Sequence, residues 1–193
     1  MNSINHIVIN GERVELPTEW RVLAKDLGMT GDDMRLLEYH FDGAKCLNGD
    51  LKAIKGKLDT KWYKLSDTKL SSKARIKGGK IQYITCSGRP VTAAIKQRSS
   101  RDTHNNYYLC FANKYYQHRL AAFLVAKEQG FKGFYNDFDM RVHHRLIDET
   151  GTENGNQLEK LTVLSDPDHK RLHKLLNKIA AEVKKGIVQT RLL

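Results

Sequence analysis

The last third of the chain constrains the fold most, because residues 141–186 hold four of the eight histidines of the whole sequence. The pattern of polar and apolar residues predicts four elements in turn: a strand at 141–144, a loop at 146–157, a strand at 160–164 and a helix at 167–186. Ser165 or Asp166 precedes Pro167, and this order is typical of a helix N-terminus. The segment therefore predicts two short strands followed by one long amphipathic helix.

The spacing of the four histidines decides which of them can meet. His169 and His173 are four residues apart in the predicted helix, so their side chains lie on one face. His143 and His144 are consecutive in the first strand, so they point to opposite sides. One strand histidine can therefore join the helical pair around a divalent ion, while the other is free to handle protons. Three imidazoles with an open position are typical of a catalytic metal site, not a closed structural one.

This strand–loop–strand–helix segment resembles the HNH (ββα-metal) endonuclease motif, in the three-histidine version of colicin-type DNases and many phage-encoded HNH nucleases. The preceding stretch YYLCFANKYYQHRLAAFLVAKE is similar to the lead-in of phage and intron homing HNH enzymes, where a hairpin precedes a His-Arg-Leu helix. The resemblance spans about residues 106–185, and residues 1–105 show no comparable family resemblance.

The resemblance implies a role for each histidine. His144 corresponds to the general base that takes a proton from water, and the metal ligands correspond to His143, His169 and His173. The implied reaction is hydrolysis of a phosphodiester bond, with 5′-phosphate and 3′-hydroxyl ends as products. The implied cofactor is one divalent ion per chain. Neutral imidazoles favour zinc or nickel; magnesium prefers oxygen ligands and would rely partly on the substrate phosphate.

The chain departs from the family pattern at one position. The family places a structural asparagine nine residues before His169, where this chain has Lys160. That asparagine ties down the loop so that a loop carbonyl orients the base. Asn154 or Asn156 takes its place here if the loop register differs by a few residues. If neither asparagine does so, the departure at Lys160 impairs the positioning of His144 and hence full activity.

Three arginines lie near the histidines in the sequence. We assign Arg145, which follows the predicted base, to catalysis as a holder of the scissile phosphate. We assign Arg119 and Arg141 to DNA binding. Arg119 is equally consistent with a structural partner of an acidic side chain.

Charge is distributed unevenly along the chain. Within residues 51–100, Lys and Arg outnumber Asp and Glu by 11, which equals the net charge of the whole chain, and such a surplus suits a polyanionic partner. A glycine pair at 78–79 predicts a hairpin whose one face carries Arg75, Lys77 and Lys80. A basic two-stranded ribbon fits the major groove of DNA. The same pattern is typical of a solvated lysine-rich surface, and both interpretations stay open.

The first 50 residues are acidic. Asn10 and Gly11 separate two short apolar segments and predict a hairpin. Helical spacing then predicts two short helices, at 18–27 and 30–39, joined by a glycine-containing turn. This pair is typical of a helix-turn-helix or of a plain helical hairpin. The acidic balance favours the plain hairpin, because DNA phosphates would repel it.

A polar stretch at 98–106 predicts the boundary between an N-terminal DNA-recognition region, residues 1–104, and an HNH nuclease domain, residues 105–193. After it, the pattern predicts a hairpin turning at Asn113 and an amphipathic helix at 118–129. The predicted fold class is therefore α+β, with a C-terminal ββα-metal unit and a mixed α/β N-terminal region of hairpins and a short helix pair.

The sequence offers no apolar run long enough to span a bilayer and no secretory leader at its start. The three cysteines are widely spaced without a CxxC pair, so neither a disulfide framework nor a cysteine zinc site is predicted. We therefore expect a cytoplasmic protein with no membrane partner, in the host-cell cytosol if it is phage-encoded.

Motif and charge together favour a metal-dependent DNA endonuclease that acts on double-stranded DNA, of the nicking or homing type found in phages and mobile elements. Two alternatives stay open. One is a DNA-binding regulator whose degenerate HNH unit holds zinc structurally. The other is a metal-dependent RNase, because the same site would hydrolyse either backbone.

Overall fold

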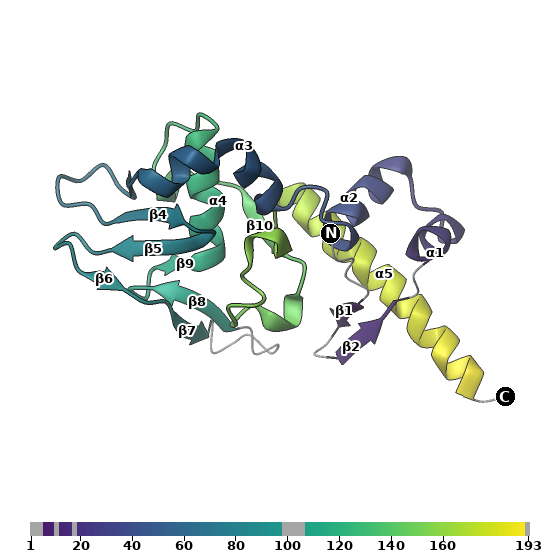
Figure 1. Cartoon of the computed structure of the whole chain (residues 1–193). Helices are drawn as coiled ribbons and strands as arrows, with labels where there is room; N and C mark the ends of the chain where they lie inside the picture. Colours follow the sequence, from purple (N-terminus) through teal and green to yellow (C-terminus); the bar gives the residue numbers. More distant parts are fainter. Residues whose placement is uncertain (1–5, 10–11, 17–18, 98–106, 192–193) are drawn as a thin grey trace.

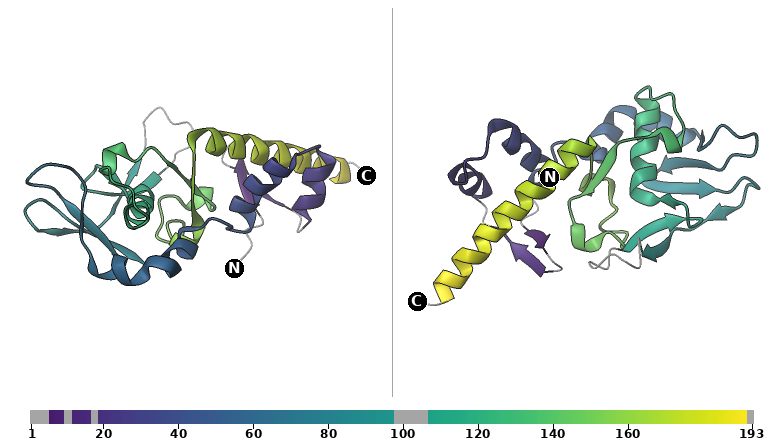
Figure 2. Two further views of the ribbon diagram at one scale, coloured as in Figure 1. Left: turned by 90° about the horizontal axis from the view of Figure 1, so that it is seen from above. Right: turned by 180° about the vertical axis from the view of Figure 1, so that it is seen from behind.

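The computed structural model describes residues 6–9, 12–16, 19–97 and 107–191. The chain is an α+β protein in which a long C-terminal helix, α5 (Asp166–Arg191), extends from the middle of the molecule to one end (Figure 1). Beside α5 lie the N-terminal elements β1 (His6–Ile9), β2 (Glu12–Glu15), α1 (Trp20–Asp26) and α2 (Gly31–Phe41). Figure 2 shows from two further directions that the larger sheets occupy the opposite end.

The N-terminal elements form one core with α5. β1 pairs antiparallel with β2, with Ile9 opposite Glu12, which confirms the two strands of the predicted hairpin; its turn lies outside the described residues. A capping box opens α2, in which the Thr30 hydroxyl accepts from the Asp33 amide and Asp33 accepts from the Thr30 amide, so the predicted second helix is confirmed. The buried members of this N-terminal core are Ile7, Val14, Leu16, Trp20, Ala24, Leu36, Leu37, Phe41, Leu164, Leu172, Leu176, Ile179 and Ala180.

The second core lies between two helices and the antiparallel sheets. The elements are α3 (Leu47–Thr60), α4 (Gln117–Glu128), the sheet β3 (Tyr63–Lys64), β4 (Lys73–Lys77), β5 (Lys80–Ile84), β6 (Pro90–Val91), and the sheet β7 (Ala94–Gln97), β8 (Tyr107–Phe111), β9 (Tyr115–Tyr116). The helix α4 and the β8–β9 hairpin are confirmed as predicted. The helix α3 is not predicted by the sequence analysis. Its Leu47, Leu51 and Leu58 are buried at helical spacing, but Gly49 and Gly56 weaken the pattern.

The β4–β5 ribbon has the predicted register and faces. Arg75 lies opposite Gln82 and Lys77 opposite Lys80. The backbone of the Gly78–Gly79 turn is left-handed at both residues, with φ of 55° and 76°, which glycine adopts at no steric cost. The apolar face, with Ala74, Ile76 and Tyr83, is buried in the second core, so the lysines face outward.

Packing crosses the predicted boundary at residue 104. β7 pairs with β8, α3 packs against α4, and α2 packs against α5, so each contact joins an element before residue 104 to one after it. Both cores therefore contain residues from the two predicted regions. The polar stretch at 98–106 lies outside the described residues.

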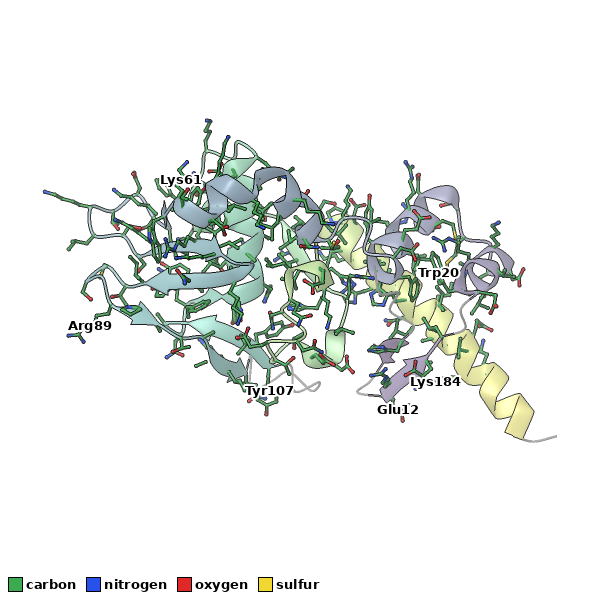
Figure 3. The ribbon with its side chains drawn as sticks, in the orientation of Figure 1. Glu12, Trp20, Lys61, Arg89, Tyr107 and Lys184 are labelled. Atoms are coloured by element: carbon green, nitrogen blue, oxygen red, sulfur yellow. The ribbon has the colours of Figure 1, made fainter. Side chains whose placement is uncertain are left out.

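The strands β10 (Arg141–His144) and β11 (Leu161–Leu164) pair antiparallel and lead into α5, in the predicted order. The Ser165 hydroxyl caps α5 by accepting from the Asp168 amide at 3.2 Å. α5 continues to Arg191, past the predicted end at Gly186. Near its far end Lys184 pairs with Glu12 of β2, and both residues are labelled in Figure 3. Among the helices of the described residues, none has the length and apolar content needed to cross a membrane.

Candidate metal centre and adjoining cavity

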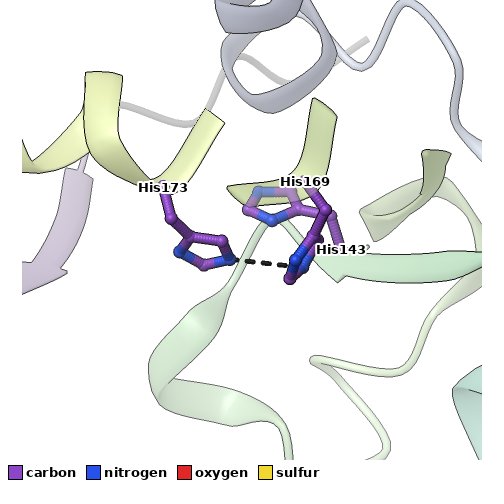
Figure 4. A group of neighbouring side chains, drawn as sticks. All are labelled: His143, His169 and His173. Carbon is purple, nitrogen blue, oxygen red and sulfur yellow. Dashed lines mark hydrogen bonds between the residues drawn. The ribbon is translucent and has the colours of Figure 1, made fainter. Parts of the chain in front are cut away.

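Three histidines meet where β10 faces the first turns of α5. His143 comes from β10, while His169 and His173 lie one helical turn apart in α5 (Figure 4). One ligand nitrogen from each ring lies within 4.8 Å of the others, so this cluster could hold a metal ion. The three residues are those that the sequence analysis assigned as ligands.

The separation of the two helical ligands suits a small ion. The Nε2 atoms of His169 and His173 are 3.3 Å apart. Two nitrogens at tetrahedral angles and about 2.0–2.1 Å from zinc would be about 3.3–3.4 Å apart. Burial lowers the pKa of His169 to about 4 and lowers the pKa values of His173 and His143 as well. The three rings are therefore neutral near pH 7, the protonation state that a metal ligand requires.

His144 points to the other side of β10, as strand alternation predicts. Its Nε2 lies 3.2 Å from Oδ1 of Asn156, which is buried. The Asn156 amide nitrogen donates to the carbonyls of Thr150 and Thr152, each at 2.7 Å, so the amide oxygen faces His144 as an acceptor. The proton of neutral His144 therefore lies on Nε2, and the lone pair lies on Nδ1. Burial lowers the pKa of His144 to about 4, against the opposing effect of the Asn156 bond, so the ring is neutral near pH 7.

The structure shows which residue orients His144. Asn156 contacts the ring directly and ties the loop together through two carbonyls. Lys160 instead donates its Nζ to Asn154 Oδ1 at 2.5 Å, and its carbonyl accepts from the Arg145 amide at 2.9 Å. Of the three loop residues that the sequence analysis named, only Asn156 reaches the predicted base.

A cavity of about 580 Å³ is lined by the three clustered histidines and by His144. Three cationic side chains and one acidic side chain line it, which gives a net charge of +2: Arg119, Arg141, Lys170 and Asp166. Asp166 accepts from Arg141 and pairs with Lys170, both at 2.6 Å, so it holds the two cations at the cavity wall. The cavity therefore offers a positive lining beside the three histidines.

Two tyrosines that the sequence did not point to complete the lining. Tyr108 and Tyr116 enter from β8 and β9. Beside them lies the ring of His118, from the start of α4, a residue that the sequence predicted as a core histidine or one that supports the site histidines. The His118 ring centroid lies 4.5 Å from that of His144. No local spacing pointed to the two tyrosines, because the β8–β9 hairpin reaches His144 only through tertiary packing.

Arg145 lies away from the cavity, and its position corrects the expectation that it holds the scissile phosphate. Its guanidinium is buried and donates to the carbonyls of His40, Phe41 and Glu159, at 2.6, 2.7 and 3.0 Å. Gly43 leaves room for it, since a Cβ there would lie 2.5 Å from Arg145 Nη1. Arg145 therefore satisfies carbonyls at the C-terminus of α2 and joins that helix to β10.

Replacing Arg145 with lysine is expected to lower the free energy of unfolding by about 1–3 kcal/mol, because one ammonium cannot reach all three buried carbonyls. Urea unfolding measures this change. The matched control is Arg141→Lys, at an exposed ion pair, for which we expect less than about 1 kcal/mol. Unchanged stability with a lower rate of cleavage in Arg145→Lys would restore the phosphate-holding role.

The two arginines assigned to DNA binding differ in the partners of their guanidinium groups. Arg119 donates to the carbonyls of Phe138 and Met140, not to an acidic side chain, and its guanidinium lies over the Tyr135 ring at 5.6 Å. Arg141 is exposed and held by Asp166. Both line the cavity.

Comparison with family models, with curated proteins and with solved structures finds no match to this chain.

Proposed function

We propose that the protein is a metal-dependent DNA endonuclease whose active site is a ββα-metal unit formed by β10, β11 and α5. The observation that carries the proposal is that consecutive residues of one strand have different partners. One belongs to a cluster of three histidines that could hold a metal ion, and the other is held in one tautomer by an asparagine. His143 joins His169 and His173 as a ligand set. His144, held by Asn156, lines the same cavity with its lone pair on Nδ1.

Hydrolysis of a phosphodiester needs a base for the water and stabilisation of the charge that develops. His144 takes the proton of the attacking water at Nδ1, while Asn156 keeps the ring in the required tautomer. The chemistry that a bound ion supplies is Lewis-acid stabilisation of the phosphorane and of the departing 3′ oxygen. Arg141 and Lys170 attract the scissile phosphate into the cavity. The expected products carry 5′-phosphate and 3′-hydroxyl ends.

The basic ribbon supports a DNA substrate. Arg75 donates from Nε to Gln82 at 2.8 Å and stacks 4.5 Å from the Trp62 ring, so its guanidinium is held in place. A second cavity, of about 870 Å³, is lined by Lys80 and Gln82 of β5 and by Asn156. The ribbon and the residue that orients His144 therefore border one cavity.

Replacing Arg75, Lys77 and Lys80 together with alanine is expected to weaken duplex binding and to reduce its salt dependence. The slope of log K against log salt should flatten by up to about three units, at about 0.9 per phosphate contact, if all three side chains touch phosphates. If they read base edges instead, discrimination between sequences should fall more than the slope changes. Fluorescence anisotropy of specific and random duplexes across a salt series measures both.

The charge-matched control replaces the exposed Lys52, Lys55 and Lys57 of α3 with alanine. An equal change of slope in the two triple variants would mean that the basic residues attract DNA only through the overall positive charge of the protein, with no special role for the ribbon. Wild-type binding by the ribbon variant would remove the ribbon from the DNA interface.

Cleavage of supercoiled plasmid tests the proposed activity directly. The full chain, stripped of metal and then given zinc, nickel or magnesium, should convert the plasmid to the open-circle or linear form, and EDTA should stop the reaction. Ends that DNA ligase reseals carry 5′-phosphate and 3′-hydroxyl groups. Intact plasmid that binds the metal-loaded protein would favour the regulator. Cleavage of a structured RNA, with the plasmid left intact, would favour the RNase.

A further inference from the structure

We propose that His40, at the end of α2, is a positioning residue of the metal centre. Its Nδ1 holds the proton of His143 on Nε2, and this leaves the Nδ1 lone pair of His143 for the ion. The inference rests on the proposed metal site and assigns to the N-terminal region a part in it. His40 lies 103 positions from His143 in the sequence, and its side chain is fully buried.

His143, His40 and the His6 carbonyl form a series of hydrogen bonds, and the last acceptor fixes the direction of both bonds. His40 Nε2 lies 3.3 Å from the His6 carbonyl oxygen, which can only accept. Neutral His40 therefore carries its proton on Nε2 and has its lone pair on Nδ1. His40 Nδ1 lies 3.0 Å from His143 Nε2, so His143 must donate there. Neutral His143 then has its lone pair on Nδ1.

The remaining nitrogen of His143 agrees with this assignment. His143 Nδ1 is buried and has no hydrogen-bond partner among the described residues. A proton on Nδ1 would leave a buried donor unsatisfied, and it would also force His40 to donate from Nδ1 and turn a lone pair toward the His6 carbonyl. A metal ion beside His169 and His173 satisfies the nitrogen instead. One tautomer pair thus satisfies every atom once the ion is bound.

The position of His40 is also fixed by contacts other than its hydrogen bond to His143. Arg145 donates to the carbonyls of His40 and Phe41, so the end of α2 is held by the residue two positions after His143. The His40 ring also packs edge-on against Phe41, with centroids 4.8 Å apart. The α2 terminus and β10 are therefore joined at two points, and His143 has little freedom to turn away from the ligand set.

Two variants separate the hydrogen bond from packing. His40→Asn keeps an acceptor near the Nδ1 position, and His40→Leu removes it while filling similar space. Competition calorimetry with zinc should show affinity about 10–100-fold lower than wild type for His40→Leu, the usual effect of losing a partner of a metal ligand, and a smaller loss for His40→Asn. Thermal unfolding of both metal-free variants shows whether they fold.

Wild-type zinc affinity in a folded His40→Leu variant would overturn the proposal, and so would equal losses in the two variants. If neither variant folds, NMR of the metal-free wild-type protein decides. We expect a scalar coupling between His143 Nε2 and His40 Nδ1 across the hydrogen bond, with the proton on His143. A proton on His40 Nδ1, or no coupling, would overturn it. A wild-type protein that shows this coupling but binds no zinc would refute the metal site and leave the His40 contact standing.

Discussion

Replacing His144 with alanine is expected to lower the rate of plasmid cleavage by about 10²–10⁴-fold, the usual contribution of a general base. Zinc affinity should stay near the wild-type value, because His144 lies on the opposite side of β10 from His143 and bonds to Asn156, not to the ligand set. DNA affinity should also stay near wild type, since a base acts on the transition state and little on the ground state. Single-turnover cleavage, zinc calorimetry and duplex anisotropy on one preparation measure the three quantities.

Asn156→Leu is the companion variant, because it removes the acceptor that fixes the His144 tautomer. Cleavage should fall in this variant too, while zinc still binds. Loss of both cleavage and zinc binding in His144→Ala would mean that the roles of His143 and His144 are exchanged. Wild-type cleavage by His144→Ala would exclude it as the base.

Replacing His173 with alanine is expected to lower zinc affinity by more than the roughly 10–100-fold that follows the loss of a mere partner of a ligand. The variant should also lose the stabilisation by zinc. At a free zinc concentration of about 100 times the Kd, the wild-type protein should gain about 2.7 kcal/mol, or about 5–11 °C in Tm for a chain of this size. An ion bound by the three histidines would link α5 to β10 and so stabilise the arrangement that the two elements share.

Lys174→Ala is the matched control for His173→Ala, because Lys174 is the next residue of α5 and is exposed. It should keep both the zinc affinity and the rise in Tm. Zinc affinity that is unchanged in His173→Ala and in His169→Ala would refute the three-histidine site. If both His173→Ala and Lys174→Ala lose the same stability without metal, that loss comes from a weaker α5 helix and not from the loss of a metal ligand.

Local spacing in the sequence was enough to predict the elements that carry the site. The HxxxH spacing places His169 and His173 on one face of α5, and strand alternation separates His143 from His144 on β10. The Ser165 cap and the β4–β5 hairpin follow from residues close together in the chain. Each of these features depends on interactions within a few residues of the chain, so it can be predicted from the sequence alone.

Tertiary packing decided how the elements meet. The sequence contains three candidates for orienting His144, and only the fold of the loop brings Asn156, not Lys160 or Asn154, to its ring. Arg145 lies beside two site histidines in the sequence, yet its guanidinium is buried away from the cavity, where it donates to the carbonyls at the end of α2.

The contribution of the N-terminal region likewise depends on long-range contacts. His40 reaches His143 only because the apolar faces of α2 and α5 pack in one core, which closes a loop of 103 positions. Helices and turns follow from interactions between near neighbours, whose spacing the sequence displays. The partners of a buried polar atom depend on which apolar faces come together, because burial leaves that atom no water to bond with. For this reason the sequence predicted the three histidines of the cluster that could hold a metal ion, and the tertiary structure decided which residues contact and orient them.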